Sequence, residues 1–221
     1  GETPCLLGRD EVRTLFHEFG HGLHGLLSKV TYPGQAGTNV RQDFVELPSQ
    51  IMEHWTWKPD VLERFAKHHE TGEPIPEDLV DRLVAAKNLN IALMKLRQMT
   101  YGTLDMNLHG PNTDRDLDRA LSDANAISLL PTHEGTFFPS SFGHLFGYDA
   151  GYYGYLWSNV YGDDMFSVFE AEGILSPDVG RRYRAEVLSR GSSRDAWDHL
   201  RAFLGREPNA EAFLEKLGIT A

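Results

Sequence analysis

The clearest pattern of hydrophobic and polar positions along the chain lies between residues 10 and 28. Apolar residues recur there at steps of three and four, at Val12, Leu15, Phe16, Phe19, Leu23, Leu26 and Leu27. This spacing is the period of an α-helix and predicts a helix from Asp10 to Ser28. The segment also holds Gly20, Gly22 and Gly25, each of which costs about 1 kcal/mol relative to Ala inside a helix. We therefore expect another element to approach this helix closely at its glycines.

The rest of the chain is also expected to form helices, with little β structure. Residues 30–42 have the Gly, Pro and Asn content of a loop, with a strand as the alternative around residues 29–45. A second helix is predicted near Asp43, with Pro48 in its first turn, where backbone donors have no helical partner. Further helix signals are found at residues 60–69, at 76–97 and on towards 108, at 114–124, and at Ser176, Gly205 and Gly218. The predicted fold class is mainly α.

Composition and charge narrow the classes of protein. The chain has 221 residues, a length compatible with a single domain over residues 1–221. Its hydrophobic fraction is 41%, and no apolar run reaches the ~18 residues that a membrane span requires. The formal charge of -11 disfavours binding to nucleic acid. Because Cys5 is the only cysteine and no signal-like segment begins the chain, we expect a cytoplasmic protein.

The first predicted helix contains the motif His17-Glu18-Phe19-Gly20-His21. A separation of four residues puts both imidazoles on one helix face, where their nitrogens can bind one zinc ion. Glu18 lies beside them, where its carboxylate can take a proton from a water molecule without binding the metal. The motif therefore predicts a catalytic zinc site with Glu18 as general base.

A catalytic zinc site needs a third protein ligand and one open position. The pattern that places Gly and His three and six residues after His21 fails, because His24 and Leu27 stand there. Glu46, at the start of the second predicted helix, can face the first helix across the loop and is the predicted third ligand. The alternative is a capping box, in which Asp43 and Glu46 satisfy the first donors of that helix. His24 is expected at the surface or behind the metal ligands, not among them.

Glu53 follows Glu46 by seven residues and therefore lies on the same helical face. Its carboxylate could accept a hydrogen bond from a ligating histidine and orient the ring. A solvated or salt-bridged glutamate is the alternative.

Five of the eight tyrosines lie between Tyr148 and Tyr161, interleaved with glycines. Phenol hydroxyls are neutral donors at pH 7 and suit the oxyanion that forms when water attacks a carbonyl, while glycines let a loop close over a substrate. The alternative is an aromatic face packed in a core. We expect that alternative for Tyr153, Leu156, Trp157 and Tyr161.

Several segments of the chain resemble one known family. They run from His17 to His24, Gly37 to Val40, Asp43 to Gln50, Gly143 to Leu145, Gly147 to Ser158 and Phe203 to Pro208. These segments are similar to the thimet oligopeptidase family of zinc peptidases, and the similarity extends through most of the chain. The resemblance implies a helical, zincin-like catalytic domain. It also implies that this chain corresponds to the C-terminal portion of longer proteins, whose N-terminal helices form the other wall of a deep channel.

The resemblance implies a metal site and a substrate class. His17, His21 and Glu46 would bind one Zn²⁺ ion, and Glu18 would be the general base. The substrates would be short peptides, because the channel admits oligopeptides but not folded proteins. The missing N-terminal portion of the same enzyme would be the partner of this chain.

The resemblance also assigns roles within the tyrosine-rich segment. Tyr155 and His144 would lie near the developing oxyanion. Tyr148 would lie beside the substrate backbone, with Tyr152 contributing to binding. The stretch from His144 to Tyr148 is one glycine shorter than the common form of the family, so a hinge glycine is absent.

Two other classes compete with a zinc peptidase. The chain could be a zinc-binding, catalytically silent fragment that needs an N-terminal partner, although Glu18 argues against a purely structural metal. A structural zinc would also be closed by four protein ligands, often including Cys, and Cys5 is the only cysteine. A thermolysin-like protease is disfavoured because no strand-rich N-terminal section is found.

Overall fold

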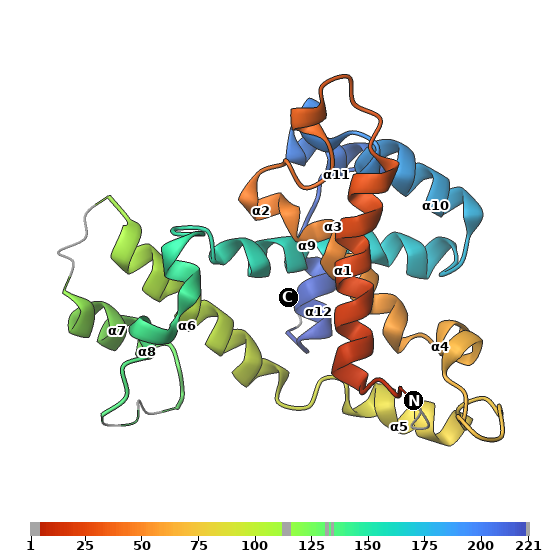
Figure 1. Ribbon diagram of the computed structural model, residues 1–221, viewed down its shortest axis with the longest axis horizontal. Helices are drawn as coiled ribbons and strands as arrows, with labels where there is room; N and C mark the ends of the chain where they lie inside the picture. The colour runs from red at the N-terminus through yellow and green to blue at the C-terminus, as the bar shows by residue number, and fades with distance from the viewer. Residues whose placement is uncertain (1–4, 112–115, 131–132, 134, 220–221) are drawn as a thin grey trace. The chain divides into compact units, whose positions relative to one another are not determined.

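The computed structural model describes residues 5–111, 116–130, 133 and 135–219 (Figure 1). Within these residues the protein is built almost entirely of helices, and the one strand-like pairing is an isolated bridge between Lys67 and Pro74. The mainly α fold class is therefore confirmed. Among the same residues, no helix combines the length and the apolar character needed to cross a membrane.

The helices follow one another with short connections. Residues 5–88 contain α1 (Arg9–Leu27), η1 (Pro33–Gln35), α2 (Gln42–Val45), α3 (Leu47–Glu53), η2 (His54–Trp57), α4 (Pro59–Phe65) and α5 (Glu77–Ala86). Residues 89–157 contain α6 (Ile91–His109), α7 (Leu117–Asn125), α8 (Phe138–Ser141), η3 (Gly143–Phe146) and the start of α9 (Tyr153–Glu172). The remainder contains the rest of α9, α10 (Pro177–Tyr183), the π-helical turn η4 (Arg184–Leu188), η5 (Gly191–Ser193), α11 (Ala196–Leu204) and α12 (Glu211–Lys216).

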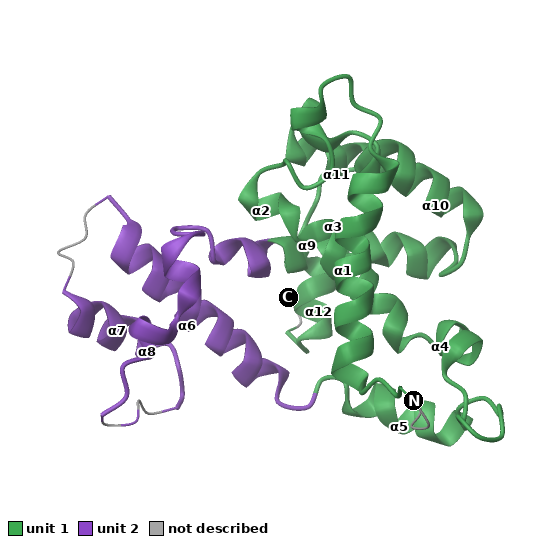
Figure 2. Ribbon diagram, viewed as in Figure 1, with its two compact units in different colours: residues 1–88, 158–221 green, residues 89–157 purple. Residues whose placement is uncertain are grey.

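The chain divides into two compact units (Figure 2). Unit 1 comprises residues 1–88 and 158–221, and unit 2 comprises residues 89–157. The expectation of a single domain over residues 1–221 stays a prediction.

Two of the predicted helices have wrong boundaries, and the alternative of a strand after the first helix is wrong. The helix expected from residue 76 towards 108 is two helices, because Asn90 adopts a left-handed backbone conformation (φ 58°) between α5 and α6. The helix expected over 60–69 ends at Phe65. The strand considered for residues 29–45 is replaced by η1 and α2.

The other boundaries agree with the sequence pattern within a few residues. Pro48 lies in the first turn of α3, as its missing N–H requires. The helix expected over 114–124 is α7, which begins after Asp116, whose side chain accepts a hydrogen bond from the N–H of Arg119. Positions 114 and 115 lie outside the described residues. The side chain of Ser176 caps α10 in the same way.

Close packing against α1 occurs at two of its three glycines. A Cβ atom on Gly20 would lie 2.4 Å from the carbonyl oxygen of Pro48, so only glycine lets the first turn of α3 come this close. The Cα atom of Gly25 would lie 2.8 Å from a Cβ placed on Gly37, which has a φ of 54°. Gly22 has no such neighbour, and the expectation is wrong there. The contact at Gly20 fixes how α3 crosses α1.

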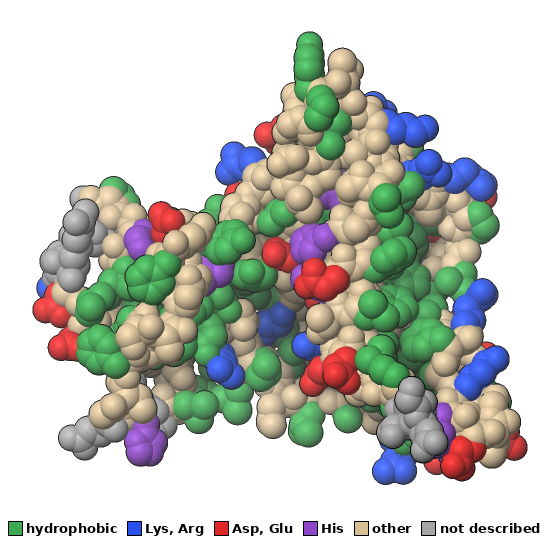
Figure 3. Space-filling view, in the orientation of Figure 1, with side chains coloured by type: hydrophobic (Ala, Val, Ile, Leu, Met, Phe, Trp, Pro, Cys, Tyr) green, Lys and Arg blue, Asp and Glu red, His purple; other side chains and the backbone are tan. Residues whose placement is uncertain are grey.

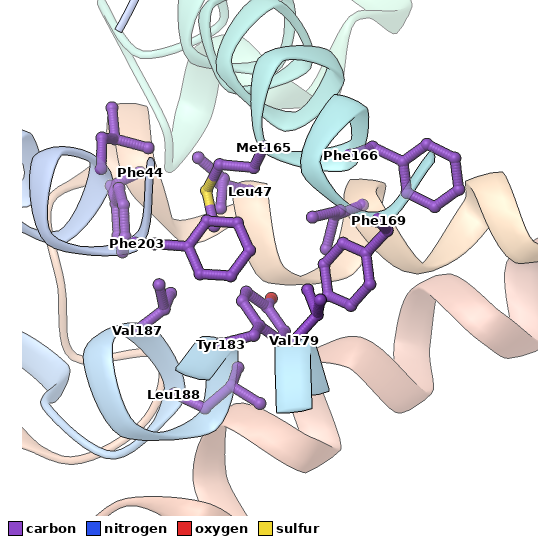
Figure 4. Packing of buried hydrophobic residues seen from close by; sticks show 12 residues of the cluster. Phe44, Leu47, Met165, Phe166, Phe169, Val179, Tyr183, Val187, Leu188 and Phe203 are labelled. Carbon is purple, nitrogen blue, oxygen red and sulfur yellow. The ribbon is translucent and has the colours of Figure 1, made fainter. Parts of the chain in front are cut away.

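The main hydrophobic core lies in unit 1 (Figure 4). It is formed by side chains of α2, α3, α9, α10, η4 and α11, among them Phe44, Leu47, Ile51, Met165, Phe166, Phe169, Val179, Tyr183, Val187, Leu188, Leu200 and Phe203. The rings of Phe169, Tyr183 and Phe203 face one another, with centroids 5.7–6.0 Å apart. Because α2 and α3 contribute to this core, the segment that carries Glu46 is held on both sides.

Unit 2 has a smaller core of its own. Leu104 on α6 and Ala120 and Ala124 on α7 are buried together, and aromatic side chains of α8 and the following turn pack against them. Helix α6 therefore holds both α7 and the segment that leads to the tyrosine-rich residues.

Candidate active site

Helix α1 presents His17 and His21 one turn apart on the same face. Their ring centroids are 5.1 Å apart, and the rings are nearly perpendicular. Glu18, the next residue along the helix, is exposed. Figure 3 shows histidine and acidic side chains lying beside one another on the surface next to the middle of α1.

Glu46 lies at the junction of α2 and α3, where one short helix ends and the next begins. The first turn of α3 approaches Gly20, which lies between the two histidines on α1. Glu46 is thereby brought to the imidazoles. The capping-box alternative is wrong, because Asp43 lies inside α2 and Arg41 precedes the helix as its cap residue.

The three predicted ligands converge on one point. Oε2 of Glu46 lies 3.2 Å from Nε2 of His17 and 3.3 Å from Nε2 of His21. These three residues form a group in which every ligand atom lies within 4.8 Å of the others. A tetrahedral zinc ion with bonds of about 2.0–2.2 Å would separate its ligand atoms by about 3.3–3.6 Å. The donor set and its spacing therefore fit a zinc ion held by three protein ligands.

A second glutamate orients the first histidine. Nδ1 of His17 lies 2.8 Å from Oε1 of Glu53, and Nε of Arg13 lies 3.8 Å from the other oxygen of that carboxylate. With its Nδ1–H donated to Glu53, His17 keeps the lone pair of Nε2 for a metal. The expectation that Glu53 bonds a ligating histidine agrees with this contact.

Sequence reasoning missed a hydroxyl group that holds the predicted third ligand, Glu46. Ser49 is fully buried, and its Oγ donates to the backbone oxygen of Glu46 at 2.8 Å and to its Oε2 at 3.0 Å. The spacing of three residues across the start of α3 was the available signal, because a serine there can reach back to the preceding turn.

The same contacts change the pKa values of the ligands in the metal-free protein. Burial lowers the pKa of His17, but hydrogen bonds with Glu46 and Glu53 outweigh burial and raise it to about 9. Burial likewise opposes ionisation of Glu46, yet hydrogen bonds with both histidines hold its pKa well below the ordinary value. The site is therefore a negative carboxylate facing a protonated imidazole, ready to exchange a proton for a cation.

His24 differs from the expectation in part. It lies outside the group of three ligands, as predicted, but it is fully buried and not at the surface. Burial, together with the neighbouring His199 and His21, lowers its pKa to about 4. Because the ring is neutral at pH 7, it can be buried without a charged partner.

The second group of predicted residues gathers in unit 2. We call residues 147–152 the tyrosine loop. The ring centroid of His144 lies 5.3 Å from that of Tyr148, 4.9 Å from that of Tyr152 and 5.8 Å from that of Tyr155. The structure thus brings together all four residues that the resemblance placed at the substrate. Tyr148 is 60% exposed, so its ring is open to a ligand.

Tyr152 is anchored within this group. Its hydroxyl lies 2.9 Å from Oε1 of Gln98 on α6, to which it donates. Burial, together with the neighbouring Tyr101 and Tyr155, raises the pKa of Tyr152 to about 12. Its hydroxyl is therefore neutral at pH 7 and already bonded to the protein.

The expected aromatic core at the start of α9 is partly wrong. Tyr153 is 41% exposed and Trp157 is 48% exposed, so neither is a core residue. Tyr161 does pack against the main core, with its ring 5.3 Å from that of Trp197. The first turns of α9 lie in unit 2, where the apolar core is small, and only the later turns enter the main core.

Two histidines of an H-E-x-x-H helix and a glutamate from a later helix thus form one group that could hold a metal ion. Comparison of the sequence with known proteins gives the family. The sequence profile of peptidase family M3 matches residues 1–219. The chain belongs to this family.

Curated relatives cover nearly the whole chain. It is 44% identical to oligopeptidase A of Escherichia coli over 223 residues, or 98% of this chain and 33% of that protein. It is 42% identical to saccharolysin of Saccharomyces cerevisiae, over 99% of this chain and 32% of that protein. A dipeptidyl carboxypeptidase of Salmonella typhimurium is 38% identical, over 98% of this chain and 33% of that protein. The chain therefore spans about a third of the length of the relatives it matches.

Proposed function

We propose that this chain forms the metal-binding part of a zinc metalloendopeptidase that hydrolyses peptide bonds in short oligopeptides. His17, His21 and Glu46 would hold one Zn²⁺ ion. The observation that carries the proposal is the position of the Glu46 carboxylate oxygen, 3.2 Å and 3.3 Å from the two imidazole nitrogens. Membership of a peptidase family supports the same function.

Zinc, when bound, would act as a Lewis acid that polarises the scissile carbonyl and makes water a stronger nucleophile. Glu18 accepts the proton of the water that attacks this carbonyl and then delivers it to the leaving amine. Its position beside His17 on an exposed helix face suits this role, because the carboxylate can reach a water near the metal ligands without being one of them.

The aromatic residues of unit 2 would bind the substrate and stabilise the charge that develops on its oxygen. Tyr155 and His144 donate hydrogen bonds to the oxyanion, and Tyr148 contacts the substrate backbone. Tyr152 supports the others, since its own hydroxyl donates to Gln98. The contacts of the His144 ring with all three tyrosines support a shared role.

A second candidate is a zinc-binding fragment that is catalytically silent until an N-terminal portion of the same enzyme joins it. One observation favours it. Leu15, Phe19 and Leu26 expose 55–77% of their surface along α1. A further wall of polypeptide would cover these apolar side chains. We infer that the remaining length seen in the relatives supplies this wall.

The setting of the enzyme is inferred from the sequence alone. The charge of -11 supports peptides over nucleic acid as the ligand class, and the single Cys5 supports a reducing, cytoplasmic compartment. Both inferences are part of the proposal.

The proposal is tested by peptide cleavage with the purified chain, alone and within a longer protein that also contains the N-terminal portion. The substrates are a mixture of short fluorogenic peptides and one folded protein. We expect cleavage of the peptides only, loss on chelation and recovery with zinc. Glu18→Gln should keep zinc and lose about 100-fold or more in kcat, whereas Glu63→Gln, on the exposed face of α4, should behave as the parent.

The outcomes separate the candidates. Cleavage by the longer protein but not by this chain, with equal zinc content, would support the second candidate, a catalytically silent fragment. Undiminished cleavage by the Glu18→Gln protein would overturn the assignment of the base.

A further inference from the structure

We propose that Asp105, on α6, is a positioning residue that holds the tyrosine loop in its working conformation. The inference rests on the proposed function in one respect, namely that residues of this loop contact the substrate. The anchoring itself is a property of unit 2 and can be measured without catalysis.

Asp105 is fully buried, and the tyrosine loop satisfies its carboxylate. One carboxylate oxygen accepts the N–H of Ala150 at 2.9 Å, and the other accepts the N–H of Tyr152 at 2.9 Å. Nδ1 of His109, one turn further along α6, lies 2.9 Å from the first oxygen. A buried carboxylate offers only acceptors, so three converging donors compensate its desolvation.

The backbone of Ala150 shows why such an anchor is needed. Its φ is 54°, in the left-handed region that residues with a Cβ disfavour. The conformation persists because the N–H groups on either side of the loop turn, at Ala150 and Tyr152, are both tied to one side chain. Without Asp105 the loop would lose its acceptors and relax to other conformations.

One face of α6 carries a row of residues that contact or closely approach residues 150–153. Gln98, Gly102, Asp105 and His109 follow one another at steps of four, three and four residues, which places them in one row along the helix. At one end of the row Gln98 accepts the hydroxyl of Tyr152. In the middle, a Cβ on Gly102 would lie 3.6 Å from the Cα of Tyr153, so the chain runs close to the helix there. The carboxylate of Asp105 is the charged centre of this row.

The row of residues on α6 connects Asp105 to the groups proposed to act on the substrate. Tyr148 and Tyr152 belong to the loop, and the ring of Tyr152 contacts those of His144 and Tyr155. Loosening the loop would therefore change the direction in which several donors point at once. Since Tyr148 contacts the substrate backbone and the ring of Tyr152 packs against both proposed oxyanion donors, we expect kcat to fall and KM to rise.

The experiment compares Asp105→Asn with Asp123→Asn, which removes the same charge from an exposed position of α7 in the same unit. Hydrogen exchange of the amides of Ala150 and Tyr152 is measured together with kcat and KM for a fluorogenic peptide. The carboxamide introduced by Asp105→Asn would turn one acceptor into a donor, so we expect exchange at both amides to be faster by about tenfold or more. kcat should fall by a similar factor, with zinc content unchanged, and Asp123→Asn should match the parent.

A rescue variant separates positioning from general damage. Because glycine reaches the left-handed region without strain, adding Ala150→Gly to Asp105→Asn should restore part of the lost kcat. If Asp105→Asn does not fold, as judged by circular dichroism, His109→Ala removes one donor to the same carboxylate. That variant should also speed exchange at both amides, by a smaller factor than is expected for Asp105→Asn.

The result that overturns the proposal is parental exchange at Ala150 and Tyr152 together with parental kcat in the folded variant. Failure of the proposed function looks different. In that case the unsubstituted protein itself shows no chelator-sensitive cleavage, while the exchange rates of the two amides still decide whether Asp105 holds the loop.

Discussion

Nδ1 of His17 lies 2.8 Å from Oε1 of Glu53, at the end of the same helix, α3, that begins directly after the proposed ligand Glu46. One short helix thus contacts the ring of His17 from both of its ends. The carboxylate that precedes its first residue lies at Nε2 of His17, and the carboxylate at its last residue lies at Nδ1 of the same ring. The ring orientation of His17 is therefore determined by α3 as much as by α1.

Replacing Glu53 should weaken zinc binding without removing a ligand. In Glu53→Gln the amide is a poorer acceptor for the Nδ1–H of His17, and Arg13 loses its nearby charge. We expect zinc affinity to fall by about 10–100-fold, the usual effect of losing such a support. Competition with a chromogenic chelator measures it, with Glu63→Gln as the control. Equal affinities of the two variants would show that the contact does not support the ligand.

The packing of α1 against α3 can be tested with two neighbouring glycines. In Gly20→Ala the new methyl group would lie 2.4 Å from the oxygen of Pro48, so the helices must separate. We expect a loss of about 1–3 kcal/mol in the free energy of unfolding and weaker zinc binding, because Glu46 moves with α3.

Gly22→Ala is the matched control, since the nearest atom to its methyl group is a ring carbon of Phe19 at 4.0 Å. Alanine there should stabilise the helix by up to about 1 kcal/mol. Urea denaturation of the metal-free proteins measures both. If Gly20→Ala were as stable as Gly22→Ala, the close approach of α3 would be contradicted.

Zinc affinity should rise with pH. The pKa of His17 is raised to about 9 in the metal-free protein, because hydrogen bonds with Glu46 and Glu53 outweigh the lowering by burial. Below about pH 9, zinc must displace this proton. The proton alone should make the apparent affinity increase about tenfold per pH unit between about pH 6 and 8, and level off above pH 9. Chelator competition across this range, with proton release into weak buffer, gives the slope. A flat profile would mean that His17 does not exchange a proton for the metal.

Removing the hydroxyl of Tyr155 should affect the chemical step. If this hydroxyl donates to the oxyanion, Tyr155→Phe loses a donor that is worth about 100-fold or more in kcat, with little change in zinc content. Tyr32→Phe makes the same chemical change at a tyrosine that is 67% exposed before η1. Comparable kcat values for the two variants would remove Tyr155 from the mechanism.

The grouping of the three proposed ligands could be predicted because it depends on local spacing. His17 and His21 share a face of one helix, and Glu46 follows a loop of ordinary length at the junction of the next two short helices, so a few residues of context bring all three together. The close approach at Gly20 could also be predicted, because a glycine inside a helix costs free energy that a closely packed neighbour would explain. These features require no knowledge of distant parts of the chain.

The features that sequence reasoning missed depend on contacts between distant residues. The carboxylate of Asp105 is buried because a loop 45 residues later supplies its donors, and nothing near Asp105 in the sequence indicates that loop. His24 is buried because α1 packs on elements from the C-terminal part of the chain. The break between α5 and α6 was also missed, because residues 87–90, which end in the left-handed Asn90, hold neither Gly nor Pro to indicate the turn.

The central claim is that His17, His21 and Glu46 bind one zinc ion. It is tested most directly by the zinc stoichiometry and affinity of Glu46→Gln beside Glu18→Gln, which makes the same chemical change at a neighbouring glutamate without touching a ligand. The account predicts one zinc per chain in the parent and in Glu18→Gln, and a loss in Glu46→Gln beyond the about 100-fold limit expected for a supporting residue. Parental zinc affinity in the Glu46→Gln protein would contradict it.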